Sequence, residues 1–527
     1  MTAAATPRAR RLAAVAAALV LAVLAVAVIR ACGSGDDAPP KDAAAKLVPD
    51  TALVFASLST DGDREAVQRA ARMAERFGAY RPNRDALLRR LSGGDKAVDA
   101  ERDVAPWLGD EAAFALLDVG QSTAGSIVAI EVADERKARA FLARNPRRPR
   151  LKAYKGVETQ RYGQVTTAFV RGFLVIGQDP TVQATIDIER SGARPLEADP
   201  TYRRAVEGLP DGRVVTAYAS ADGLRRMLAP QGDVIGGLSA MLDQPALQGV
   251  ALAVAAEGED RVRLHVHSAL DADAQRANAP KQFEPQLLEA VPEDVLGYLG
   301  ASGVTGALQR LVASAVGGAD VGRLLARLRS ELQKVTGGGL ERDLLKLFEG
   351  EVAVVIQQQT PAPILSVVAR TEDEGGTRRT LDRLRDPLAR LLRPRGEAAP
   401  TWKPQDVEGT DAWTLTLPNG AAVTYAVLDG RLILSTSPEG VRRIARAEDS
   451  LEDSGAFEDV LSDRPDRVGT LGFLDFSQLL ELGEQTGLND SPAYLSVRDD
   501  LHKVRAIGVS STSSEGESTA EILVSIP

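Results

Sequence analysis

The pair His265 and His267 has the spacing that best fits metal chemistry in this sequence. Both lie in the run Arg-Val-Arg-Leu-His-Val-His that starts at Arg261. Two residues apart on a strand, the rings point to the same side, as two ligands of one metal ion would. No third histidine lies near them in the sequence, and a basic, solvent-facing strand side explains both residues. We therefore expect no metal and no other cofactor.

Acidic residues and serines offer no clear catalytic pattern. Glu101-Arg102-Asp103 and Glu341-Arg342-Asp343 could do acid–base chemistry, but a charged helix turn before a buried strand is the simpler explanation. Asp61-Gly62-Asp63 lacks the later ligands of a calcium loop, and Asp63 is predicted to cap the next helix. Residues 300–303, Gly-Ala-Ser-Gly, are expected to form a loop before a helix. No nucleotide-binding loop occurs, so no catalytic residue is assigned.

The single cysteine, Cys32, follows a long apolar run. Arginines precede this run, and residues 12–29 carry no charge. A basic start before such a run is typical of an export signal or a membrane anchor. At 1.5 Å per residue the run reaches about 27 Å, close to the hydrocarbon thickness of a bilayer. Basic residues before the run favour a cytoplasmic start, so the rest of the chain would face outward.

Two interpretations of this N-terminal region stay open. In the first, residues 12–29 remain as a single-pass anchor. In the second, Cys32 is the lipidated first residue of a lipoprotein, and the glycine- and proline-containing residues 33–40 are its tether. Arg30 counts against the second, because bacterial lipidation sites carry small or apolar residues there. Both predict a cell-membrane protein, single-pass or lipid-anchored, with its body outside the cytoplasm.

Composition excludes several classes of protein. A chain of 527 residues is too long for one ordinary core. With 44% hydrophobic and 26% charged residues it is neither globally disordered nor a multi-pass membrane protein. A single cysteine rules out an intrachain disulfide. The formal net charge of −10 makes nucleic acid an unexpected partner, because phosphate binding needs a basic surface.

An internal repeat runs through the rest of the chain. A similar stretch, Ala-Val-Pro-Glu at 290–293, matches Leu47-Val48-Pro49-Asp50. In the same order, Glu351 matches Glu111 and Gly430 matches Gly172. A fixed-period match of this kind indicates two copies of one structural unit. The predicted organisation is a basic start with a transmembrane or signal segment (1–32), a flexible tether (33–45), a first repeat (46–270), a linker (271–283) and a second repeat (284–527).

Strands and helices mix within each repeat. The pattern predicts a helix over 63–77, a hairpin around Arg171-Gly172 and its counterpart around Asp429-Gly430. Pro180 and Pro438 are expected to begin short helices after these hairpins. Two strands should close each copy, 248–256 with 261–268 and 506–512 with 520–526. Short connections favour antiparallel pairing. Alternation at the end of each copy predicts a sheet with one wet, basic face and one face covered by helices. The predicted fold class is α+β, a tandem duplication of two antiparallel-sheet-plus-helix domains behind the N-terminal transmembrane or signal segment.

Two segments have the character of binding surfaces. Residues 304–332 form an amphipathic pattern that could meet a partner or a lipid surface, although an apolar stripe more often covers a sheet. Residues 147–150, with Lys152 and Lys155, make a basic cluster that could touch an anionic membrane, although a solvated turn explains it too.

Three short motifs carry a resemblance to a known family. They are the opening Leu47-Val48-Pro49 with Ala52-Leu53, the run Leu108–Ala113 (Leu-Gly-Asp-Glu-Ala-Ala), and Phe173–Gly177 before a helix. On these motifs the chain resembles an uncharacterised actinobacterial family of predicted secreted or membrane-anchored proteins with a domain of unknown function. The resemblance implies an envelope location and brings no activity or site residue.

These observations favour a membrane-anchored extracytoplasmic protein, most simply a non-enzymatic binding or scaffold protein of the bacterial cell envelope. Its expected partners are the membrane, through residues 12–29 or lipid on Cys32, and an envelope protein or an apolar ligand held between the two repeats. The alternative is a carboxylate-dependent extracytoplasmic hydrolase, which requires two convergent carboxylates with shifted pKa values.

Overall fold

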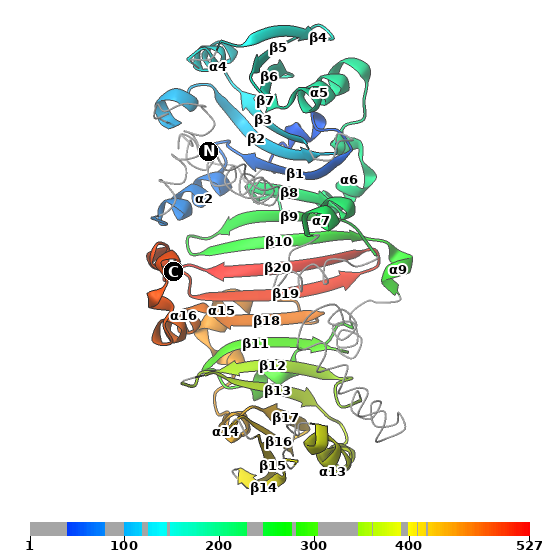
Figure 1. Cartoon of the computed structure of the whole chain (residues 1–527), viewed down its shortest axis with the longest axis vertical. Coiled ribbons are helices and arrows are strands. Elements are labelled where there is room, and N and C mark those ends of the chain that lie inside the picture. The colour runs from blue at the N-terminus through cyan, green and yellow to red at the C-terminus, as the bar shows by residue number, and fades with distance from the viewer. Residues whose placement is uncertain are drawn as a thin grey trace.

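The computed structural model describes residues 39–78, 100–118, 125–144, 148–228, 246–276, 281–303, 346–360, 362–391, 399–407, 409–417 and 420–527. In these residues a single antiparallel sheet of 20 strands runs along the length of the molecule (Figure 1). The predicted mixture of helices with antiparallel sheet is confirmed.

The first half contributes β1 (Ala52–Ser59), β2 (Leu108–Leu117), β3 (Gly125–Val132), β4 (Arg150–Tyr154), β5 (Val157–Tyr162), β6 (Val165–Val170), β7 (Phe173–Gly177), β8 (Val215–Ser220), β9 (Leu247–Glu257) and β10 (Arg261–Leu270). The second half contributes β11 (Val295–Ser302), β12 (Glu351–Gln357), β13 (Ile364–Arg370), β14 (Trp402–Val407), β15 (Thr410–Thr416), β16 (Ala422–Leu428), β17 (Arg431–Ser435), β18 (Thr470–Asp475), β19 (Ala506–Ser514) and β20 (Glu517–Ser525).

The described helices are α2 (Glu65–Glu75), α4 (Glu135–Leu142), α5 (Asp179–Ser191), α6 (Pro200–Glu207), α7 (Ala221–Leu228), α9 (Ala272–Arg276), α13 (Glu374–Leu391), α14 (Pro438–Ala445), α15 (Gly455–Leu461), α16 (Phe476–Gln485), α17 (Pro492–Leu495) and α18 (Arg498–Leu501). Short helical turns are η2 (Ala43–Lys46), η3 (Ala100–Val104), η4 (Leu196–Ala198), η5 (Gln286–Ala290), η6 (Leu451–Asp453) and η7 (Leu488–Asp490).

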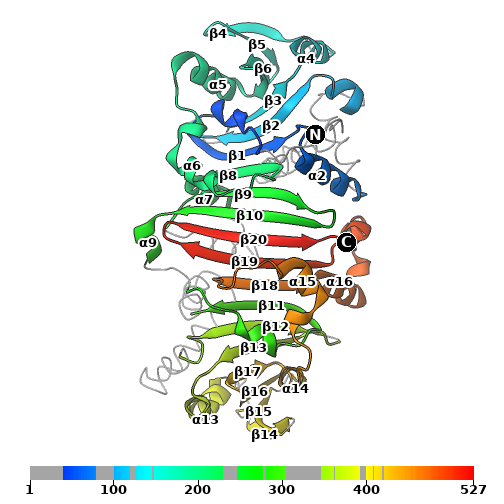
Figure 2. The ribbon, with the colours of Figure 1, turned by 180° about the vertical axis from the view of Figure 1, so that it is seen from behind.

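Both halves pair their strands in the same order outward from the middle of the sheet. In the first half the order is β10–β9–β8–β1–β2–β3–β7–β6–β5–β4. In the second half it is β20–β19–β18–β11–β12–β13–β17–β16–β15–β14. Figures 1 and 2 show this arrangement from both sides, with β4 at one end of the molecule and β14 at the other.

Local signals in the sequence placed several of these elements correctly. Arg171 and Gly172 have φ values of 47° and 82°, and Asp429 and Gly430 have 47° and 69°. Positive φ at both central residues is the backbone of a tight hairpin turn, which twists as the flanking strands do. Pro180 and Pro438 stand in the first turns of α5 and α14, where a missing N–H costs nothing.

The two predicted sheets are in fact one. β10 and β20 lie side by side and antiparallel, from Arg261 opposite Ser525 to Ala269 opposite Glu517. An exposed edge strand leaves a row of N–H and C=O groups unpaired, and here the last strand of each half pairs with the other. A second contact joins the halves where the Lys503 ammonium donates to the Arg76 carbonyl at 2.6 Å.

The prediction that the histidine-bearing face of β10 is exposed to solvent is also wrong. Helices α6 and α15 pack on the face of the central strands that carries His267, not on the apolar one. Tyr202 and Ala205 of α6 pack against alanines of β9 in the first core. On the opposite face, Met73 of α2 packs near Val262. Alternation shows which side chains share a face, but not which face the helices cover.

Candidate binding sites

The two histidines of β10 both contact protein groups in the fold. His265 Nδ1 lies 2.5 Å from Glu521 Oε1 on β20, so this pair joins the two halves. His267 is 4% exposed, and its Nδ1 donates to the Ala205 carbonyl at 2.8 Å. Over the ranges that the structure describes, no three His, Cys, Asp or Glu side chains gather as a metal ion would need.

The other predicted motifs also serve the fold. Asp103 is buried, and Arg144 donates to its carboxylate at 2.6 Å. The cap of α2 was predicted wrongly, because Arg64 and not Asp63 stands at the N-cap position. The expected loop at 300–303 is wrong for its first three residues, since β11 continues to Ser302.

Several predicted features lie outside the described residues. They are residues 12–29, Cys32, the triplet 341–343 and the amphipathic segment 304–332. Among the helices that are described, none has the length and apolar character to cross a bilayer.

A buried glutamate stands at the same place in each half. Glu111 of β2 accepts hydrogen bonds from the backbone N–H of Ala43 (2.7 Å) and Ala44 (3.1 Å) in η2. Glu351 of β12 accepts from Gln286 (3.1 Å) and Leu287 (3.0 Å) in η5. Burial raises the pKa of Glu111 to about 7 and also raises the pKa of Glu351.

These are shifted carboxyls of the kind that a hydrolase would need, but they lie in different halves. Each one holds the helical turn that precedes the first strand of its own half. An acid–base pair needs both groups around one reacting bond. The arrangement therefore indicates a structural role for Glu111 and Glu351, in which a carboxyl satisfies the free N–H groups of a helical turn.

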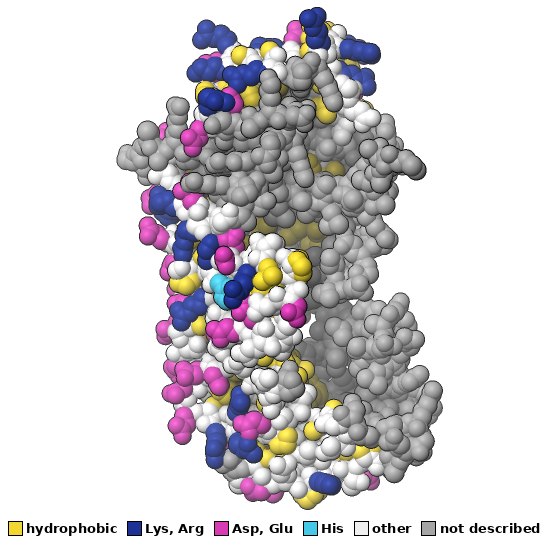
Figure 3. Space-filling model, turned by 60° about the vertical axis from the view of Figure 1, so that its left-hand side comes forward, with side chains coloured by type: hydrophobic (Ala, Val, Ile, Leu, Met, Phe, Trp, Pro, Cys, Tyr) yellow, Lys and Arg dark blue, Asp and Glu magenta, His cyan; other side chains and the backbone are white. Residues whose placement is uncertain are grey.

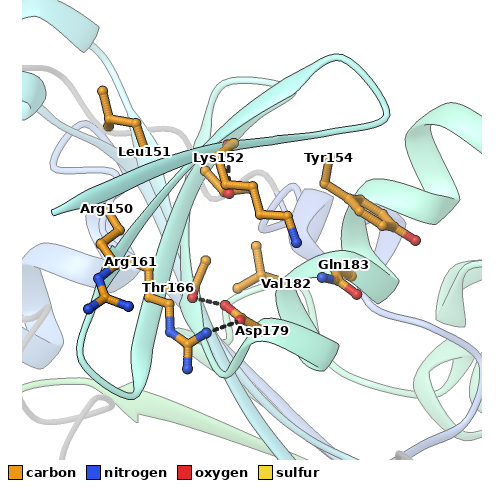
Figure 4. Close-up of a pocket in the computed structure, with 10 residues that line it drawn as sticks. Arg150, Leu151, Lys152, Tyr154, Arg161, Thr166, Asp179, Val182 and Gln183 are labelled. Atoms are coloured by element: carbon orange, nitrogen blue, oxygen red, sulfur yellow. Dashed lines mark hydrogen bonds and ion pairs between the residues drawn. The ribbon is translucent and has the colours of Figure 1, made fainter.

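A cavity of about 270 Å³ lies under the edge strand β4, between the β4–β6 strands and α5. We call it the β4 cavity (Figure 4). Lys155 and Gly156 form the tight turn from β4 to β5, with φ values of 45° and 80°. Because Arg150 and Lys152 alternate with Leu151 on β4, both cations point into the cavity while Leu151 points away (Figure 4).

Charge in the β4 cavity is mostly positive. On its floor, Arg161 Nη1 donates to Asp179 Oδ2 at 2.9 Å, and Thr166 donates to the other carboxylate oxygen. Asp179 is thus neutralised by Arg161. Arg150 and Lys152 are exposed, and in the described part of the chain neither has an acidic partner. Arg150 and Lys152 are therefore both placed to bind an anionic group in the cavity.

A second surface, the apolar strip, crosses the junction of the two halves on the sheet face opposite α6 and α15. Residues paired across neighbouring strands point to the same face of a sheet, and here two adjacent rows contain only apolar residues and glycine. One row is Leu264, Ile522, Val509, Gly472, Leu299, Val354 and Val367. The other is Val262, Val524, Ile507, Leu474, Gly297, Ile356 and Leu365.

Parts of the apolar strip are open to solvent. Leu299 is 52% exposed and Leu365 is 45% exposed, which is unusual for leucines on a sheet face. Gly472 and Gly297, on neighbouring strands, add no side chain between the rows. At about 4.8 Å between strands, the seven strands of the strip cover about 29 Å.

A comparison with models of protein families identifies the family of this chain. One family model, described as a protein of unknown function (DUF3352), matches residues 12–526. The chain belongs to the DUF3352 family. The expected membership of a family of unknown function is thereby confirmed. No curated protein sequence matches this DUF3352 chain.

Solved structures show only weak likeness to this DUF3352 protein. Crystal form IV of TP0453 shares 10% identity at a TM-score of 0.27, and the match covers 44% of this chain and 81% of that one. Crystal form III of TP0453 shares 9% identity at a TM-score of 0.27, with 45% and 87% covered. Likeness at this level supports no conclusion about function.

Sequence reasoning found the basic cluster of β4 but missed the cavity beneath it and the whole apolar strip. The basic cluster around Lys152 was visible in the sequence, but the cavity beneath it needs α5 and Arg161 to be folded against β4. The apolar strip is hidden because its rows combine strands from both halves. The alternation Arg150-Leu151-Lys152 on one short strand is a sequence signal that could have indicated a surface with two cations on one side.

Proposed function

We propose that this protein is a membrane-tethered extracytoplasmic binding protein that holds the acyl chain of a lipid-like ligand on the apolar strip. The tether is residues 12–29 as an anchor or lipid on Cys32. The two halves are repeats of one duplicated unit, a proposal supported by their identical strand order and by the matched Glu111 and Glu351.

The observation that carries the proposal is the exposure of Leu299 and Leu365 within a continuous apolar strip. An exposed apolar patch marks a binding surface more often than an accident of folding. Shape favours a long ligand over a compact one. A bilayer core of about 30 Å gives each acyl chain about 15 Å. Met73 of α2 packs against Val262 and Val524 at one end of the strip, and the five strands from β19 to β13 that remain cover about 19 Å.

Acyl binding is tested with a fluorescent fatty acid, cis-parinaric acid, and the full-length protein. Replacing both Leu299 and Leu365 by Gln removes apolar area that the ligand would bury. At about 1 kcal/mol for each half-exposed leucine, the double variant should bind about 30-fold more weakly. Leu495→Gln with Val497→Gln is the matched control, because both side chains are exposed outside the strip, 54% and 39%.

Equal affinity of the strip variant and the control variant would refute acyl binding at this face. Native mass spectrometry of the protein extracted gently from its own membrane gives an independent result. A stoichiometric extra mass that is lost in the strip variant supports the proposal, and a bare mass in both proteins opposes it. The tether is tested by acyl labelling of the wild type against Cys32→Ala, where lipidation predicts label only on the wild type.

A further inference from the structure

We infer that the β4 cavity binds the phosphate-bearing headgroup of an anionic lipid, so that the β4 end of the molecule docks on the membrane surface. This inference rests on the proposed membrane tether and is independent of acyl binding on the apolar strip. Its starting point is the pair of cations, Arg150 and Lys152, that point into the cavity and have no acidic partner among the described residues (Figure 4).

The β4 end is strongly basic in a chain that is acidic as a whole. Residues 134–165 contain ten Lys or Arg and three Asp or Glu, a net charge of +7. The whole chain has a net charge of −10. Figure 3 shows Lys and Arg side chains gathered at the end of the molecule that carries β4, β5 and α4.

The opposite end of the sheet provides an internal comparison. The corresponding stretch, residues 374–411, contains eight Lys or Arg and seven Asp or Glu, a net charge of +1. The sheet therefore has two ends of the same topology, and only one of them is charged to attract an anionic surface.

The cavity suits a small anionic group. Its volume of about 270 Å³ is at the lower limit of ordinary ligand sites, which fits a headgroup phosphate better than a larger molecule. With Asp179 neutralised by Arg161, the remaining charge of Arg150 and Lys152 is about +2, which suits one phosphate.

A side chain beside the cavity suits the apolar layer of a membrane. Leu151 stands between Arg150 and Lys152 and is 66% exposed, the largest exposure among the large apolar side chains of the described residues. Cations for the headgroup next to an apolar side chain are typical of a membrane-surface contact. A soluble phosphate ligand would give Leu151 no partner.

The reach of the tether allows this contact. Residues 33–40 span at most about 27 Å when extended. The chain enters the sheet near β1 and β2, where the Lys41 ammonium donates to Asp110 at 2.7 Å. Asp110 lies on β2, and from β2 to β4 there are five strand spacings, or about 24 Å, which is within that reach. A body lying with its β4 end on the bilayer is therefore compatible with a membrane anchor before residue 33.

The test uses the full chain in nanodiscs of phosphatidylcholine, with or without phosphatidylglycerol, and measures hydrogen exchange of the β4–β5 backbone. We expect slower exchange in the anionic discs. Each cation near an anionic leaflet strengthens the contact about five-fold, so Arg150→Gln with Lys152→Gln should reduce that protection up to about 30-fold. The matched control is Arg390→Gln with Lys403→Gln, two exposed cations at the other end.

Three outcomes overturn the inference. One is equal exchange in both kinds of disc, and a second is equal loss of protection in the control variant. A third is the same protection by soluble glycerol 3-phosphate without lipid, which would assign the cavity to a free phosphate. Vesicle flotation separates this inference from the proposed tether. A protein that does not float refutes the tether, whereas a floating protein with unchanged exchange refutes only the headgroup site.

Discussion

Glu111 should make this protein less stable as pH rises, the reverse of what a salt-bridged carboxylate does. Its side chain is 4% exposed, and burial raises its pKa from 4.5 to about 7. The hydrogen bonds from Ala43 and Ala44 favour the charged form but do not outweigh burial. One pKa unit is worth about 1.4 kcal/mol, so the rise amounts to about 3 kcal/mol.

The sign follows from proton binding in the two states. Below pH 4.5 the carboxyl is protonated whether the chain is folded or unfolded, and the cost is absent. Between pH 4.5 and about 7 the folded protein keeps a proton that the unfolded chain releases, so stability falls as pH rises. Above about pH 7 the whole loss of about 3 kcal/mol is present.

Glu111→Gln isolates this contribution, because glutamine has the shape of the protonated acid and does not titrate. We expect wild type and variant to have similar unfolding free energies at pH 4.5. At pH 8 the variant should be more stable by up to about 3 kcal/mol. Guanidinium unfolding followed by tryptophan fluorescence measures both, and the buried Trp107 reports on the same half.

Glu197→Gln is the control, since Glu197 is exposed in the same half and undergoes the same chemical change. It should leave the pH dependence as in the wild type. An equal change in stability at both pH values for Glu111→Gln would mean that the backbone N–H groups stabilise the ionised carboxylate as well as water does. The reasoning from burial would then be refuted.

Three further variants test contacts within the fold. Arg213→Met removes a buried guanidinium that donates to Asp42 at 2.8 Å and should cost about 3 kcal/mol in denaturant unfolding; a neutral result would mean that water replaces the pair. Gly440→Ala places a methyl group 2.6 Å from Ile364 Cγ2 and should cost about 1–3 kcal/mol, seen as a lower Tm. His267→Leu removes the buried hydrogen bond to the Ala205 carbonyl and should cost about 1–3 kcal/mol, with no response of the wild type to zinc; a zinc-dependent rise in Tm would contradict the structural role.

Local elements could be predicted from the sequence because their signals act within a few residues. Asp429-Gly430 sets a hairpin through its own φ values, and Pro438 starts a helix through its fixed ring. Alternation in β10 showed correctly that Val262 and Leu264 share one face while His265 and His267 share the other. Repeated motifs such as Glu111 and Glu351 indicated matching positions in two halves.

What those positions do was decided by tertiary structure. Glu111 appeared in the sequence only as part of a repeated motif, yet its pKa depends on being buried against η2, which lies more than 60 residues earlier. His267 appeared solvent-facing until α6 was seen to cover it. Burial changes the meaning of a polar residue, and burial depends on which distant element packs above it.

The candidate surfaces show the same limit. The apolar strip exists because β10 pairs with β20, a contact between residues more than 240 positions apart. The β4 cavity exists because α5 brings Asp179 to Arg161 beneath Arg150 and Lys152. Residue type and periodicity determine which elements form and which side chains share a face. Only long-range packing decides which faces are covered, because an unpaired strand edge or an open sheet face accepts whichever complementary surface the rest of the chain brings to it.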